Sequence, residues 1–169
     1  MKNKKILITG GAGMIGHELV DILISKGNSI TVTSIEDKNC VDFNFDLDYI
    51  QGDLRDVSFC RNICKGKDII FHLAGIKGSP QMAIQKPSSF FVPMLQLNTN
   101  LLDAAARSDA EWVLYTSSVG VYGNFESPED EMWKEFPSQK DWYGGWAKRM
   151  GELQIDSYIK EFGINRYSI

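Results

Sequence analysis

The sequence lacks long hydrophobic runs and lacks an excess of positive charge. No apolar stretch approaches the roughly 18 to 20 residues that a membrane-spanning helix needs. Eighteen Lys and Arg against 22 Asp and Glu leave a formal net charge of −4, and the scattered basic residues give no electrostatic footprint for nucleic acid. The apolar run at residues 6–9 is far too short for the core of a signal peptide. We therefore expect a cytoplasmic protein that binds neither membrane nor nucleic acid.

Cysteine and histidine are also scarce. The three cysteines are Cys40, Cys60 and Cys64, and the two histidines are His17 and His72. Cys60 and Cys64 are four residues apart and would share one face of a helix, a spacing that could serve a metal ion. Both histidines lie far away in the sequence and no third ligand is close, so we expect no metal site. Thiols buried in a reducing compartment are the favoured interpretation.

What the sequence does contain is an alternation of short apolar runs and amphipathic stretches. This pattern is typical of βαβ units and predicts a single α/β domain built on a parallel sheet. Strands are predicted at 5–9, 29–34, 49–51, 68–73 and 112–116, with a sixth beginning at 167–169, and helices at 14–26, 57–64, 89–107 and 145–162. Gly75, Gly78 and Pro80 favour a mobile loop between residues 74 and 86. Pro93 is expected in the first turn of its helix, because proline interrupts a helix interior.

A glycine-rich segment, TGGAGMIG at residues 9–16, lies between the first predicted strand and its helix. A pyrophosphate must approach the backbone amides at the helix N-terminus, and a Cβ would obstruct it. Strand, glycines and helix in this order predict a dinucleotide site and a sheet ordered 3-2-1-4-5. The alternative is a flexible turn without a ligand. The predicted contacts are Gly10, Gly11, Gly13, Met14, Ile15 and Gly16.

Further motifs make a family resemblance specific over nearly the whole chain. GDLR at 52–55, FHLAG at 71–75, SSVGVYG at 117–123 and GWAKRMGELQ at 145–154 are similar to segments of the extended short-chain dehydrogenase/reductases. Within that group the chain resembles the NAD-dependent epimerase/dehydratase family. The resemblance implies a Rossmann-type, doubly wound parallel sheet, and it makes His72 a scaffold residue. The chain departs from the family at Met94, where relatives often have asparagine.

The same resemblance implies which residues contact the cofactor. Asp53 would bind the adenine amino group, although capping the next helix is an alternative role. Glu36 lies twenty residues after Gly16, the spacing of the acid that receives the ribose hydroxyls, but matching the strands to the family puts that position on Ser34. Only Lys38 is near to hold a 2′-phosphate, so NAD is favoured and NADP stays an alternative. The remaining implied contacts are Leu54, Leu73, Ala74, Gly75 and Lys148.

The predicted catalytic residues are Ser118, Tyr143 and Lys148. In the family a YxxxK motif puts tyrosine and lysine on one helix face, and the lysine's charge favours the tyrosinate that acts as general base. Here Lys148 is clear, but Gly144 stands four residues before it and Tyr143 stands one place early. On an ideal helix Tyr143 would lie about 100° from the face of the lysine. Either the two glycines let Tyr143 swing into the site, or the usual base is absent.

These residues favour an enzyme that transfers hydride between a carbon of a nucleotide-diphosphate sugar and NAD. The resemblance implies that residues 1–169 form an NAD(P)-binding Rossmann domain, truncated before a small C-terminal sugar-binding domain. It also implies a homodimer formed by the helices at 89–107 and 145–162, whose extra apolar residues include Phe91, Leu102, Trp146 and Tyr158. A non-catalytic NAD(P)-binding or regulatory module and an unrelated Rossmann enzyme are the alternatives. The identity of the sugar, and the choice among epimerase, dehydratase and reductase, are not readable from these residues.

Overall fold

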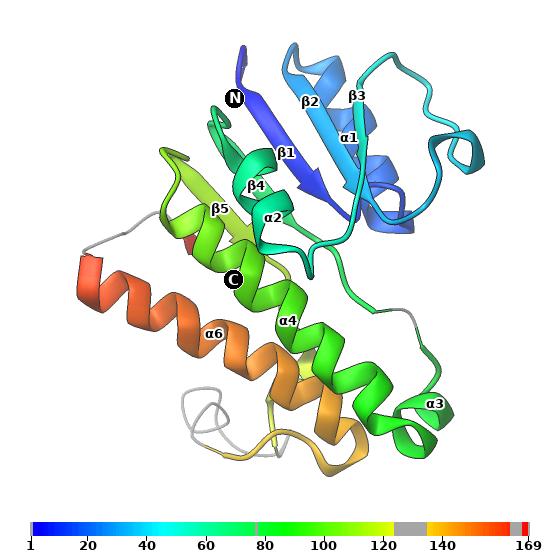
Figure 1. The fold of residues 1–169 in the computed structure, drawn as a ribbon, viewed down its shortest axis with the longest axis vertical. Helices are drawn as coiled ribbons and strands as arrows, with labels where there is room; N and C mark the ends of the chain where they lie inside the picture. The colour runs from blue at the N-terminus through cyan, green and yellow to red at the C-terminus, as the bar shows by residue number, and fades with distance from the viewer. Residues whose placement is uncertain (1, 77, 124–134, 163–166, 169) are drawn as a thin grey trace.

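A computed structural model describes residues 2–76, 78–123, 135–162 and 167–168 (Figure 1). The described strands form one parallel sheet in the order β3-β2-β1-β4-β5-β6, which confirms the predicted fold class and strand order. The strands are β1 (Lys5–Thr9), β2 (Ser29–Ser34), β3 (Asp48–Gln51), β4 (Ile69–His72), β5 (Trp112–Tyr115) and β6 (Tyr167–Ser168). The helices are α1 (Met14–Ser25), α2 (Val57–Cys64), α3 (Pro80–Gln85), α4 (Pro87–Ala106) and α6 (Trp142–Phe162). Short 3-10 turns are η1 (Lys38–Cys40), η2 (Val119–Val121) and η3 (Gln139–Asp141).

Helices cover both faces of the sheet, because successive residues of a strand point to opposite sides. On β1, Ile6 and Ile8 pack into a cluster with Val20 and Leu23 of α1. Leu7 points the other way, into a cluster built with α2 and α4. Figure 1 shows α4 and α6 running side by side on that second side of the molecule. The continuous apolar runs of the central strands are thus explained by burial on both faces.

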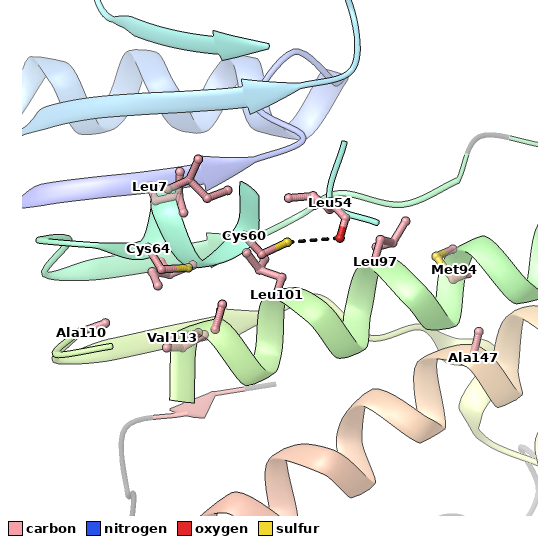
Figure 2. Close-up of a cluster of buried hydrophobic side chains, with 14 residues drawn as sticks. Leu7, Leu54, Cys60, Cys64, Met94, Leu97, Leu101, Ala110, Val113 and Ala147 are labelled. Atoms are coloured by element: carbon pink, nitrogen blue, oxygen red, sulfur yellow. Dashed lines mark hydrogen bonds between the residues drawn. The ribbon is translucent and has the colours of Figure 1, made fainter. Parts of the chain in front are cut away.

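The cluster under α2 also contains two of the thiols (Figure 2). Cys60 and Cys64 are buried as predicted, and burial raises the pKa of each thiol to about 12. Cys40 differs from the expectation, because it is exposed at the end of η1. Within the described residues no group of three His, Cys, Asp or Glu side chains could hold a metal ion. Likewise, none of the described helices has the length and hydropathy of a membrane span.

Two expectations for residues 74–107 are wrong. The predicted loop contains α3, because Ser79 caps this helix by accepting a hydrogen bond from the Met82 amide at 3.2 Å and Pro80 suits its first turn. Pro93 does not lie in a first turn, since α4 already begins at Pro87. Proline has no N–H to donate to the carbonyl four residues earlier, so α4 lacks one backbone hydrogen bond at Ser89.

The start of α6 is also earlier than predicted. The helix begins at Trp142, directly after η3, and not at Gly144 or Gly145. Both glycines are buried, and a Cβ on Gly145 would overlap the carbonyl oxygen of Gly120 in η2. Gly145 is therefore required by close packing of η2 on α6, Gly144 lies against the carboxylate of Asp141, and the pair does not mark a flexible entry to the helix.

Candidate functional site

The glycine-rich segment forms a tight turn between β1 and the N-terminus of α1. Gly10 has a φ of +70°, and a Cβ on it would lie 2.7 Å from the Cα of Ala74. Gly16 is equally confined, because its Cβ would lie 2.6 Å from the Cα of Gly11. Gly13 caps α1 without a side-chain hydrogen bond, so the amides of the first turn are left for another partner. Such a turn is a ready site for an anion.

A cavity of about 590 Å³ opens beside this turn, along the carboxyl ends of β1, β2, β3 and β4. This is where ligands bind in open parallel sheets. Nine of the predicted cofactor contacts line it: Gly10, Gly13, Ser34, Glu36, Asp53, Leu54, Leu73, Ala74 and Gly75. Sequence reasoning missed others, among them Thr33, Ile35, Arg55 and Pro93. Thr33 and Ile35 flank Ser34 at the end of β2, a position from which they could have been found.

The remaining predicted contacts lie outside the cavity lining. Met14 and Ile15 are 86% and 67% exposed at the start of α1. A Cβ on Gly11 would lie 2.7 Å from the Val32 side chain, so Gly11 serves the packing of the turn on β2. Lys148 lies on α6 and is not among the residues that line the cavity.

Asp53 is oriented by the residue two places after it. Arg55 donates two hydrogen bonds to Asp53 Oδ2, at 2.9 Å from Nε and 2.5 Å from Nη2. These bonds, more than any other effect, hold the pKa of Asp53 below its usual value. The alternative role for Asp53 is wrong, because Asp56 caps α2 by accepting from the Ser58 and Phe59 amides. Asp53 is thus left at the cavity wall as a fully ionised carboxylate.

Ser34 and Glu36, the two candidates for the ribose hydroxyls, both line the cavity. Ser34 Oγ accepts a hydrogen bond from the Glu36 amide at 3.3 Å. The Tyr49 hydroxyl donates to the Glu36 carbonyl at 2.8 Å and fixes the backbone after β2. The two predicted positions are therefore neighbours on one wall and do not exclude each other.

His72 is fully buried in a polar network that crosses the sheet and two helices. Asn98 Oδ1 can only accept, so His72 Nε2 donates to it at 3.1 Å and Nδ1 accepts from the Thr9 hydroxyl at 2.8 Å. The Asn98 amide in turn donates to the Ala147 carbonyl at 3.5 Å. Burial first, and then the charge of Lys148, lower the pKa of His72 to about 3. These contacts agree with the expected scaffold role.

Lys148 and Ser118 lie on two elements that pack together, α6 and the residues leading into η2. Lys148 Nζ donates to the Thr116 carbonyl at 2.8 Å and lies 4.9 Å from the centroid of the Tyr115 ring. Burial lowers the pKa of Lys148 to about 8. Ser118 caps η2, its hydroxyl accepting from the Gly120 amide at 3.1 Å.

Tyr143 lies in the first turn of α6 and not outside the helix as predicted. Its side chain is 38% exposed, and its ring packs 5.8 Å from the ring of Phe91 on α4. Within the described residues no hydrogen bond joins its hydroxyl to Ser118 or Lys148. At Gly144, the usual place of the tyrosine, a Cβ would overlap the carboxylate of Asp141. A side chain at that position would therefore require Asp141 to move.

Comparison with known proteins identifies a family whose model matches this chain. The model of a family described as "NAD dependent epimerase/dehydratase family" matches residues 6–169. The chain is 28% identical over 138 residues to a bifunctional UDP-glucose 4-epimerase and UDP-xylose 4-epimerase of Pisum sativum, covering 73% of this chain and 39% of the relative. It is 30% identical over 120 residues to a 3 beta-hydroxysteroid dehydrogenase/Delta 5→4-isomerase of Mycobacterium tuberculosis, covering 69% of this chain and 32% of the relative.

A solved structure agrees over almost the whole chain. The UDP-N-acetylglucosamine 4-epimerase from Methanobrevibacter ruminantium M1, in complex with UDP-N-acetylmuramic acid, matches with a TM-score of 0.81 and 28% identity. The match covers 99% of this chain and 54% of that one, so the chain spans about half the length of that structure and less of the curated relatives. The strand order, the glycine turn and the family match lead to one conclusion. The chain belongs to the NAD dependent epimerase/dehydratase family.

Proposed function

We propose that the chain is the cofactor-binding part of an NAD-dependent enzyme that epimerises or dehydrates a nucleotide-diphosphate sugar. The observation that carries the proposal is the Gly10–Gly16 turn, whose close backbone approaches admit no Cβ and whose helix N-terminus faces a cavity of about 590 Å³. A dinucleotide fits this combination, since its pyrophosphate requires bare amides and its adenosine requires an adjacent cleft.

The walls of the cavity suggest how each part of NAD would be held. The carboxylate of Glu36, with Ser34 beside it, would receive the ribose hydroxyls. Asp53 would accept from the adenine amino group, because its pKa is lowered and it stays an acceptor at neutral pH. A carboxylate at this wall disfavours the extra phosphate of NADP, so we propose NAD as the preferred cofactor.

Three residues are proposed to act on the sugar. Bound NAD supplies an acceptor for the hydride that leaves the sugar carbon. The Ser118 hydroxyl would hold the reacting oxygen, and Tyr143 would take its proton. Lys148, mostly protonated below its pKa of about 8, would favour the tyrosinate and bind the nicotinamide ribose. The substrate class rests on the relatives, whose names include epimerases of UDP-glucose and UDP-N-acetylglucosamine.

A second candidate is a dinucleotide-binding module without catalysis. Gly144 favours it, because the helix position that shares the face of Lys148 carries no side chain and the carboxylate of Asp141 lies in its place. The two candidates differ in the role of Tyr143, which the first requires and the second does not. Under either one, we propose a cytoplasmic location, in which the free thiols of Cys40, Cys60 and Cys64 stay reduced.

Binding of NAD can be tested at Gly10 with a matched control at Gly27. Gly10→Ala should weaken NAD binding at least tenfold, because the new methyl group would push Ala74 and the turn apart. Gly27 has a similar φ of +80°, but nothing lies near its Cβ. Gly27→Ala should therefore cost similar backbone strain and leave NAD affinity unchanged. Isothermal titration calorimetry with NAD and NADP measures the affinities of the unaltered chain and of both variants.

The proposal fails if the unaltered chain binds neither dinucleotide at millimolar concentration. It also fails if Gly10→Ala and Gly27→Ala change the affinity equally, since the turn would then have no special part in binding. Tighter binding of NADP than of NAD would overturn only the cofactor preference.

A further inference from the structure

Two charged residues on α6, Arg149 and Glu152, are buried although nothing in the proposed chemistry uses them. Their side chains are only 8% and 6% exposed. Arg149 Nε lies 3.5 Å from Glu152 Oε2, three residues along the same helix. Burying two charges is costly unless further hydrogen bonds satisfy them. The partners of this pair therefore indicate what the pair does.

Two of the partners of this pair lie on one short segment, residues 116–121, which contains Ser118. A further partner is the Glu135 carbonyl, which accepts from Arg149 Nη1 at 3.2 Å. The Ser117 hydroxyl donates to Glu152 Oε1 at 2.5 Å. Arg149 donates from Nη2 to the carbonyl of Val121, at the far end of the segment. A third residue of α6, Lys148, donates to the carbonyl of Thr116 at the near end. Three side chains of one helix thus hold the segment at both of its ends and at Ser117.

We propose that Glu152 and Arg149 are positioning residues that hold residues 116–121, and with them the Ser118 hydroxyl, in a fixed place relative to Lys148. Among the residues that the structure describes, Ser118 makes hydrogen bonds only within the segment, where its hydroxyl accepts from the Gly120 amide at 3.1 Å and its carbonyl accepts from the Val121 amide at 3.1 Å. Its place relative to α6 is consequently set through its neighbours, by the bonds at Ser117 and Val121 and by the close approach of Gly120 to Gly145. The functional meaning of this arrangement rests on the proposed function, in which Ser118 and Lys148 act on one substrate.

The protonation of Lys148 reports on this arrangement without any ligand. Packing of the segment on α6 buries Lys148, and burial is what lowers its pKa to about 8. If the segment were released, water would reach the ammonium group and its pKa would rise toward the usual 10.5. Loss of the negative charge of Glu152 cannot itself raise this pKa, because removing a carboxylate does not favour the charged form of a lysine. A rise therefore reports a change in position and not the lost charge.

The experiment is an NMR titration of the Lys148 side-chain ¹³C signal in the chain without cofactor, with Lys148→Arg used only to assign the signal. Ser117→Ala and Glu152→Ala should each raise the pKa of Lys148 by about one unit or more. Glu152→Gln keeps an oxygen that can accept from Ser117, so in this variant the pKa of Lys148 should stay close to its lowered value in the unaltered chain. Asp156→Asn, at an exposed carboxylate paired with Lys160 on the same helix, should leave the pKa unchanged.

An unchanged or lowered pKa of Lys148 in Ser117→Ala would overturn the proposal, even if the melting temperature fell. Ser117→Ala decides the matter if Glu152→Ala fails to fold, because it leaves the buried ion pair intact. Failure of the proposed function is separate, since it appears as absence of NAD binding while the titration is made without NAD. In the complete gene product, a fall in kcat for Ser117→Ala with NAD affinity unchanged would extend the proposal to turnover.

Discussion

Gly144 stands where a tyrosine would share a helix face with Lys148, and the carboxylate of Asp141 lies where the side chain of a larger residue would begin. Asp141 fills the space in front of it, and η2 packs against the neighbouring Gly145. Tyr143, one place earlier, lies on a different face and packs on Phe91. Sequence spacing alone could identify this departure, but only the packing shows that a larger residue at 144 would collide with Asp141.

Tyr143→Phe tests whether this tyrosine is the base. Removing the hydroxyl should reduce kcat at least about 100-fold while NAD affinity stays the same, because proton transfer is lost and cofactor contacts are not. Turnover is measured with UDP-glucose and UDP-N-acetylglucosamine on the complete gene product. Tyr158→Phe, on the same helix but bonded to Asp103, is the matched control and should retain activity. Full activity of Tyr143→Phe would assign the proton to another group and favour Ser118 and Lys148.

Among the elements, α4 and α6 contribute more apolar surface than the sheet covers. Leu102, which the sequence suggested for an outer face, is instead fully buried against Tyr115 and Ile155. Its burial follows from the packing between β5 and the two helices. The exposed apolar residues of α4 and α6 include Val92, Met150 and Leu153, at 47%, 37% and 40% exposure.

This exposed face leads us to expect a homodimer in which α4 and α6 pair with their copies. Light scattering at increasing concentration should then give twice the mass of one chain. Leu153→Glu should shift the equilibrium to monomer, because the interface would bury an unpaired charge. Ile22→Glu, at a 49% exposed site on α1, should leave the dimer intact. If Leu153→Glu kept the dimeric mass of the unaltered chain, the interface would lie elsewhere.

For the molecule as a whole, the buried His72 predicts a loss of stability in mild acid. Its pKa is about 3 in the folded chain and about 6.5 when unfolded, so below pH 6.5 only the unfolded state takes up the proton. The free energy of unfolding should therefore fall by about 1.5 kcal/mol between pH 6.5 and 5 from this residue. Urea unfolding at each pH measures this free energy. In His72→Asn the free energy of unfolding should fall less steeply between pH 6.5 and 5, whereas His17→Gln should behave like the unaltered chain. The same dependence on pH in both variants and in the unaltered chain would show that His72 is not the cause.

The sequence by itself determined the parallel sheet, its strand order and the glycine turn. Each of these depends on local patterns: apolar runs of strand length, helical periodicity, and glycines at fixed offsets between β1 and α1. The bounds of β1, β2 and α2 were predicted to the residue for the same reason. The family resemblance of the segments GDLR and FHLAG likewise implied Asp53, Leu54, Leu73, Ala74 and Gly75 as cofactor contacts, and all five line the cavity.

Only the tertiary structure decided the rest. The start of α6 and the path of α4 through Pro93 differ from what the local pattern indicates. The packing of Gly145 on η2 and the partners of Arg149 and Glu152 depend on contacts between residues distant in the chain. A glycine pair has a low intrinsic preference for a helix, yet η2 can approach α6 closely only where no Cβ intervenes. Charged residues are mostly exposed in proteins, but the partners of Arg149 and Glu152, which include Ser117 and Val121, become neighbours only in the folded chain. Local patterns carry no record of such contacts, and it is these contacts that set the positions of Ser118 and Lys148.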